Sequence, residues 1–171
     1  MPPDTARPVR VCSQDDSRFG LLTVRRRRPT ACGVPPVGVV PHVCEWGSVY
    51  GAVEPTTGER AFLARPSLHA DLFPRFIDAC AQAFPDSLTI LRLENSGAHT
   101  AQHLRWPEHV RPLGLPPYGP ELNPSERVWR DLKDDLAWLQ CPDLEAQQVS
   151  VGNVLQTDEA PALQALTSYA D

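Results

Sequence analysis

The chain has 171 residues, of which 42% are hydrophobic and 22% are charged, so it is long enough for one domain with a sizeable core. Its formal net charge of −5 is unlike that of a free-standing DNA-binding module, which is usually basic. No apolar run approaches the ~20 residues of a membrane helix, and residues 1–11 lack the apolar stretch of a signal peptide. We therefore expect a cytoplasmic protein that has no membrane partner.

The first third of the chain predicts consecutive strands. Short runs rich in valine, aromatic and other apolar residues predict strands at residues 9–12, 19–24, 43–53 and 60–64. The acidic pair Asp15-Asp16 falls between the first two runs, and residues 54–58 (EPTTG) carry a strong turn signal before the last one. Strands that follow one another without long spacers predict an antiparallel meander.

Helical signals dominate the remainder of the chain. Residues 70–84 place apolar side chains on one face at i, i+4 spacing, which predicts an amphipathic helix. Compact apolar runs predict two further strands at residues 88–93 and 110–115. Further helices are predicted at residues 99–104, after the pair Asn123-Pro124, at residues 143–155 and at residues 160–169. This order predicts an α/β fold, in which helices pack on a mixed sheet. We expect one domain over residues 1–140, with residues 141–171 as its helical tail.

Three acidic residues stand near the ends of the predicted elements. Asp15 and Glu94 each follow a predicted strand, and Glu126 lies in the first turn of a helix that follows another strand. Ligands of α/β sheets bind beyond the carboxyl ends of the strands, so we expect these three carboxylates to converge. Asp16 competes with Asp15 for this role. Because adjacent strand residues point to opposite faces, we expect only one of the two to serve.

Other interpretations of the same acids remain open. Asp15 also suits a surface turn. Glu126 also suits a capping box, with Asn123 at the N-cap, Pro124 at the first helical position and Glu126 at the third.

Three segments carry a family resemblance. They are residues 14–20 (QDDSRFG), 93–99 (LENSGAH) and 115–129 (LPPYGPELNPSERVW). In this order they resemble the three acidic motifs of the IS630 transposases, which belong to the Tc1/mariner superfamily. The third motif is the most specific, because it is long and rich in uncommon residues. The resemblance covers most of the chain, from about residue 9 to residue 139.

The resemblance implies an RNase H-like fold and a DDE transposase, which cuts and joins DNA with two divalent metal ions. Asp15 matches the first acid of the family and Glu126 the third. Glu94 stands where the family normally has aspartate. Two Mg²⁺ or Mn²⁺ ions would clamp the attacking and leaving oxygens of an in-line phosphoryl transfer. Since glutamate is one methylene longer than aspartate, Glu94 either binds metal after a local adjustment or marks an impaired copy.

Supporting roles are expected for a few other residues. Asn95 either orients Glu94 or a phosphate or ends the strand, and His99 matches the histidine of the second motif. The run Arg25, Arg26, Arg27 and Arg28 either neutralises DNA phosphates or is a solvated tip. The four tryptophans, Trp46, Trp106, Trp129 and Trp138, are interpreted as packing residues.

The resemblance also implies partners. Transposases of this family carry helix-turn-helix segments before the catalytic domain, and nothing before residue 9 suits one. We expect the DNA of transposon ends and targets as partner, together with an upstream or frame-shifted helix-turn-helix half and a homodimer during the reaction. Two alternatives to an active transposase are an impaired remnant that acts at most as a DNA-associated module, and a stand-alone RNase H-like nuclease.

Overall fold

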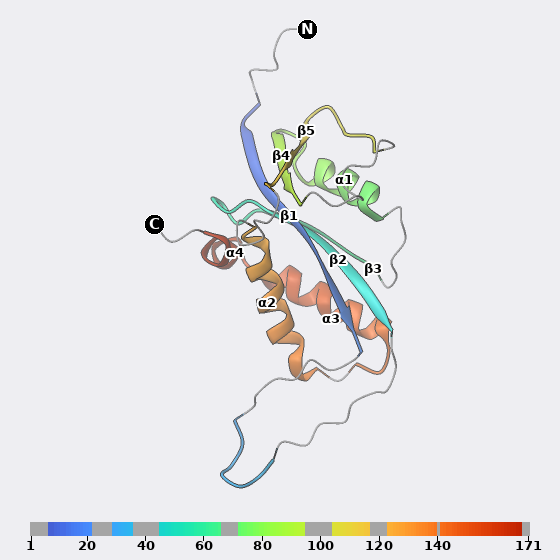
Figure 1. The fold of residues 1–171 in the computed structure, drawn as a ribbon, viewed down its shortest axis with the longest axis vertical. Helices are drawn as coiled ribbons and strands as arrows, with labels where there is room; N and C mark the ends of the chain where they lie inside the picture. The colour runs from blue at the N-terminus through green and yellow to red at the C-terminus, as the bar shows by residue number, and fades with distance from the viewer. Residues whose placement is uncertain are drawn as a thin grey trace.

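A mixed sheet forms the centre of the protein (Figure 1). The computed structural model describes residues 7–21, 29–35, 45–65, 72–94, 104–116, 123–139 and 141–168. Within these ranges the strands are β1 (Val9–Gly20), β2 (Trp46–Val53), β3 (Arg60–Arg65), β4 (Leu88–Leu93) and β5 (Val110–Gly114). They lie in the order β3-β2-β1-β4-β5, with antiparallel pairing from β1 to β3 and parallel pairing of β1 with β4 and of β4 with β5. The predicted α/β class and the predicted meander are confirmed.

Helices cover both faces of this sheet (Figure 1). Their bounds are α1 (Leu72–Ala83), α2 (Ser125–Asp135), the 3-10 helix η2 (Leu136–Trp138), α3 (Leu144–Thr157) and α4 (Ala160–Thr167). On one face, α1 buries the apolar stripe that its i, i+4 spacing predicted, with Phe76 and Ile77 fully covered. On the other face, α2, α3 and α4 pack around Trp129, Val151 and Leu163. None of the described helices is long and apolar enough to cross a membrane.

β1 is one long strand, which corrects the prediction of separate strands at residues 9–12 and 19–24. The strand runs unbroken from Val9 to Gly20, and the acidic pair lies in its middle, opposite Gly51 and Tyr50 of β2. The strand continues through these polar residues because β2 pairs with β1 from Ser13 to Gly20.

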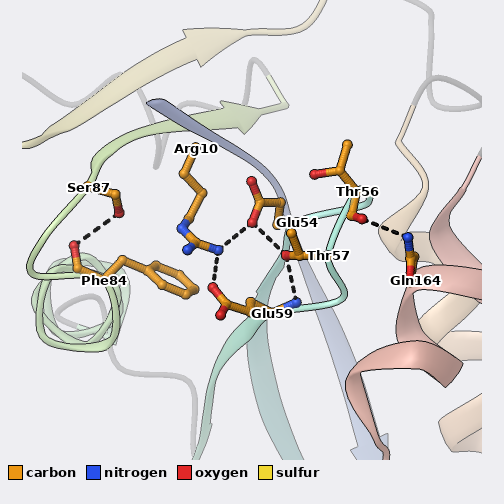
Figure 2. A network of polar contacts seen from close by, with 8 residues as sticks. All are labelled: Arg10, Glu54, Thr56, Thr57, Glu59, Phe84, Ser87 and Gln164. Carbon is orange, nitrogen blue, oxygen red and sulfur yellow. Dashed lines mark hydrogen bonds and ion pairs between the residues drawn. The ribbon is translucent and has the colours of Figure 1, made fainter. Parts of the chain in front are cut away.

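The predicted turn at residues 54–58 joins three parts of the molecule (Figure 2). Glu54 and Glu59 both pair with Arg10 of β1, and Thr57 donates a hydrogen bond of 2.6 Å to Glu54. The guanidinium of Arg10 lies over the ring of Phe84, which follows α1. The distance from Cζ of Arg10 to the ring centroid is 4.6 Å. From α4, the side chain of Gln164 donates a hydrogen bond of 2.7 Å to the carbonyl of Thr56. The turn is therefore an anchor for β1 and α4.

Gly58 is the residue of this turn that tolerates a side chain least. Its φ is +73°, and a Cβ built on it would lie 1.8 Å from the carbonyl oxygen of Ala160. We expect Gly58→Ala to lower the free energy of unfolding by about 1–3 kcal/mol, because the left-handed backbone and the contact with α4 both oppose it. Urea unfolding measures this loss.

Gly152 offers a matched control for that substitution. It lies inside α3 with no atom within 4 Å of a built Cβ. Alanine there should stabilise the protein by about 0.5–1 kcal/mol through helix propensity alone. Equal effects at the two positions would contradict the proposed role of the turn.

Candidate active site

Asp15 and Glu94 lie side by side across the junction of β1 and β4. The parallel ladder pairs Val9 with Leu88 and continues to Ser13 with Arg92. The ladder ends there, and Glu94 directly follows the last residue of β4, near the part of β1 that contains Asp15. The negative charge of Glu94 is one of the causes that raise the pKa of Asp15, which agrees with this proximity. Two of the three predicted acids are therefore brought together, although Asp15 stands inside its strand.

The carboxylate of Asp15 is held by one donor on each oxygen. The backbone N–H of Asp16 donates to Oδ1 at 2.9 Å, and the indole Nε1–H of Trp129 donates to Oδ2 at 2.9 Å. Burial raises the pKa of Asp15 to about 6, and the charges of Glu94 and Asp16 add to the rise, while the two hydrogen bonds oppose it. Asp15 is therefore an anion that the folded protein stabilises incompletely.

Asp16 belongs to the opposite face of the sheet. Its partner across the ladder, Tyr50, packs against Phe73 and Phe76 of the α1 layer. Burial, and then the charge of Asp16, raise the pKa of Tyr50. The two neighbouring acids therefore lie on opposite faces of the sheet, and Asp15 is the one on the face that α2 covers.

The start of α2 is tied to the backbone just before Asp15. Asn123 donates a side-chain hydrogen bond of 2.9 Å to the carbonyl of Gln14, and Ser125 donates one of 2.8 Å to the carbonyl of Ser13. Both donors are buried, with 3% and 1% of their surface exposed. These bonds fix the position of the start of α2 along β1, because they join the first residues of the helix to one short stretch of that strand.

The described residues show one half of the capping arrangement that the sequence allowed, in which the side-chain oxygen of Asn123 accepts the N–H of Ser125. Pro124 is the N-cap residue of α2 and makes no side-chain cap. Proline has no N–H that Glu126 could accept, and the amide of Asn123 is committed to β1 while its oxygen accepts the N–H of Ser125 at 3.2 Å. Glu126 itself is exposed in the first turn of the helix. It is therefore free of the capping role that the sequence allowed.

Glu126 lies in α2 between two residues that contact β1. It directly follows the Ser125 anchor and precedes by one turn Trp129, whose indole reaches Asp15. Among the residues that the structure describes, no three His, Cys, Asp or Glu side chains gather closely enough to hold a metal ion. Glu126 therefore does not form a three-acid cluster with Asp15 and Glu94 in the described residues.

We expect Asn123→Ala to lower the free energy of unfolding by about 1–3 kcal/mol, because it leaves the buried carbonyl of Gln14 without its donor. Urea unfolding followed by circular dichroism measures the loss. Asn153, which is exposed on α3, is the matched control, and its alanine variant should stay within about 0.5 kcal/mol of the native chain. Similar losses at both positions would show that the anchor contributes little.

Other predicted site residues lie outside the described ranges. These are Asn95, His99 and the four arginines Arg25, Arg26, Arg27 and Arg28. Most of the predicted helix at residues 99–104 lies outside them too.

Sequence reasoning missed the roles of three residues in the third motif. Trp129 was expected to pack only, and it also bonds to Asp15. Asn123 was expected to cap α2, and together with Ser125 it anchors that helix to β1. A usable signal was present, since two small polar residues and a tryptophan flank Glu126 within one motif. Trp46, also expected to pack, has 48% of its surface exposed.

Two sequence comparisons relate the chain to known proteins. Residues 10–146 match the sequence profile of the family described as "DDE superfamily endonuclease". The "Uncharacterized protein y4pE/y4sA" of Sinorhizobium fredii (strain NBRC 101917 / NGR234) is 32% identical over 95 residues, which make up 55% of this chain and 69% of that protein.

Solved structures share the fold. The Mos1 transposase in a paired-end complex with the left transposon end has a TM-score of 0.65 at 14% identity, over 92% of this chain and 51% of that chain. A Mos1 mariner paired-end complex with Mn has a TM-score of 0.64 at 14% identity, over 92% and 51%. The catalytic core domain of BIV integrase has a TM-score of 0.52 at 20% identity, over 88% and 85%. These similarities confirm the RNase H-like fold. The chain spans about half the length of the Mos1 chains that it matches.

Proposed function

Because this chain belongs to the DDE superfamily endonucleases, we propose that it is the catalytic domain of an IS630-type DNA transposase, which cuts DNA strands and joins them to a target. The observation that supports this most directly is the proximity of two acids, Asp15 on β1 and Glu94 just after β4. On the family's pattern these are the first and second acids. Glu126, on the anchored helix α2, is the third.

The residues present suit divalent cations. Carboxylate oxygens are the hard ligands that Mg²⁺ and Mn²⁺ prefer. The raised pKa of Asp15 shows that its charge is poorly compensated by burial and by the neighbouring Glu94, and a cation between the two would relieve that cost. Glu126 is exposed, so its flexible side chain has room to turn toward the pair. We propose that Asp15, Glu94 and Glu126 together hold two Mg²⁺ or Mn²⁺ ions.

The chemistry divides between the ions and the chain. Bound divalent ions lower the pKa of an attacking hydroxyl and stabilise the oxygen that leaves phosphorus. Water attacks first and a DNA 3′-hydroxyl second. The chain supplies the frame, with Asp15 on a central strand and the start of α2, which carries Glu126, tied to β1 by Asn123 and Ser125. We propose DNA as the partner and suggest phosphate contacts for Arg25, Arg26, Arg27 and Arg28.

Titration calorimetry with MnCl₂ tests the metal site. The native chain should bind Mn²⁺, and Asp15→Ala should abolish the binding, because it removes the best-held ligand. Asp16→Ala is the matched control, since that acid lies next in sequence on the other face, and it should bind as the native chain does. Equal binding by Asp15→Ala and the native chain would overturn the site assignment.

A nicking assay separates an active enzyme from an impaired one. Supercoiled plasmid in Mn²⁺ should be nicked by the native chain and not by Asp15→Ala. The longer side chain of Glu94 makes a second outcome informative. If only the Glu94→Asp variant binds metal and nicks DNA, the domain is folded but disabled, and the impaired remnant is the better description.

A further inference from the structure

The indole of Trp129 is the side chain of α2 that reaches the site. It is 5% exposed, and its Nε1–H donates to Oδ2 of Asp15 at 2.9 Å across the gap between helix and sheet. We propose that Trp129 is a positioning residue, which sets the orientation of the Asp15 carboxylate for metal binding. This inference rests on the proposed function and adds a residue to it.

The two donors to Asp15 act as a pair. The indole holds Oδ2 from the helix side, and the backbone N–H of Asp16 holds Oδ1 from the strand itself. One bond to each oxygen fixes both the direction and the plane of the carboxylate, which a single bond would leave able to rotate. A metal site with near-octahedral geometry depends on that orientation.

The indole also suits the electrostatics. A lysine or arginine at this place would neutralise Asp15 and compete with a cation. An indole is a neutral donor with no charge of its own. The indole therefore orients the carboxylate and leaves the negative charge of Asp15 available to a cation. The pKa of Asp15 is raised despite this hydrogen bond.

Strand β2 makes room for this arrangement at Gly51. Gly51 lies directly opposite Asp15 in the ladder, and a Cβ built on it would come within 2.5 Å of the Trp129 ring and 2.6 Å of the Phe62 ring. The ring of Phe62 then packs against the indole, with 5.9 Å between centroids and 60° between planes. Gly51 on β2 therefore leaves space for the indole, and Phe62 on β3 packs against it and holds it near Asp15.

Nitrogen-15 NMR of the indole groups tests the contact in the metal-free protein. The chain has four tryptophans, so the spectrum is simple, and Trp129→Phe assigns the peak of Trp129. Asp15→Ala should shift the Trp129 indole peak and leave those of Trp46 and Trp106 in place, because it removes the acceptor. Asp16→Ala keeps that acceptor and should move the Trp129 peak much less. An unmoved Trp129 peak in Asp15→Ala would overturn the proposal.

Calorimetry tests the consequence for metal. Trp129→Phe keeps an aromatic ring but loses the donor, and its Mn²⁺ affinity should fall about 10–100-fold, the effect typical of a group that orients a ligand. Trp106→Phe makes the same change on the other face of the sheet, where Trp106 packs against Phe73 of α1, so it should keep native affinity. Thermal unfolding of both variants shows that they are compared in the folded state.

The outcomes separate this proposal from the function that it rests on. If Asp15→Ala abolishes Mn²⁺ binding and a folded Trp129→Phe binds like the native chain, the positioning role is refuted and the metal site stands. If Asp15→Ala binds Mn²⁺ normally, the metal site itself is refuted. Should Trp129→Phe fail to fold, the indole peak in Asp15→Ala still decides whether the contact exists.

Discussion

Asp15→Asn is expected to make the metal-free protein more stable at pH 8, by up to about 3 kcal/mol, while abolishing Mn²⁺ binding. Burial raises the pKa of Asp15 from 3.8 to about 6. A carboxyl whose pKa is higher in the folded state ionises more readily in the unfolded state, so its contribution to stability falls as pH rises between these two values. Asparagine has a similar shape, can still accept the indole hydrogen bond and carries no charge.

The pH dependence identifies the cause. In EDTA, the stability difference between Asp15→Asn and the native chain should be small at pH 4 and should grow between pH 4 and about pH 6, as measured by urea unfolding. Asp16→Asn removes an acid of the same type from the exposed position next to it and should show a smaller change. A difference that is constant with pH would mean that the ionisation of Asp15 does not strain the fold.

Leu163→Ala is expected to lower the free energy of unfolding by about 2–5 kcal/mol. Leu163 lies on α4, is fully buried and belongs to the same apolar cluster as Val128 and Trp129 of α2. The last helices therefore complete the core under the site, and we propose that residues 141–171 belong to the same folding unit as the rest. Urea unfolding gives the loss, and a single transition is expected.

Leu139 is the matched control for this substitution. It has 52% of its surface exposed, so its alanine variant should unfold within about 0.5 kcal/mol of the native chain. A mild effect of Leu163→Ala, or a separate early transition in the native chain, would indicate that the C-terminal helices form an independent appendage.

The fold was predictable where local pattern and tertiary structure agree. The strand at residues 88–93 was predicted with its observed bounds, and the apolar spacing of residues 70–84 gave the helix that became α1. The two weaker helical segments near the C-terminus are α3 and α4, and the α/β class followed from the order of the elements. The three motifs indicated a DDE enzyme, which the sequence profile confirms, while the IS630 assignment stays a prediction.

What the sequence did not yield depends on contacts between distant residues. Asp15 and Asp16 were placed beyond the end of a predicted strand because charged residues are uncommon inside strands. Their place in β1 is set by pairing with β2 on one side, together with the proximity of Glu94 on the other. The bond from Trp129 to Asp15 joins residues far apart in the chain, and no periodicity encodes it. Asn123 looked like a cap because its other partner, the carbonyl of Gln14, lies on a remote strand.

The strand order also implies a sequence of events during folding. The hairpin of β2 and β3 closes between Val53 and Arg60, whereas β1 and β4 pair Val9 with Leu88 across nearly half of the chain. Closing the longer loop costs more entropy, so we expect the hairpin to form early and the β1–β4 ladder late. Asp15 and Glu94 meet only in that last step. In stopped-flow refolding, the capacity to bind Mn²⁺ should therefore appear after most of the secondary structure has returned.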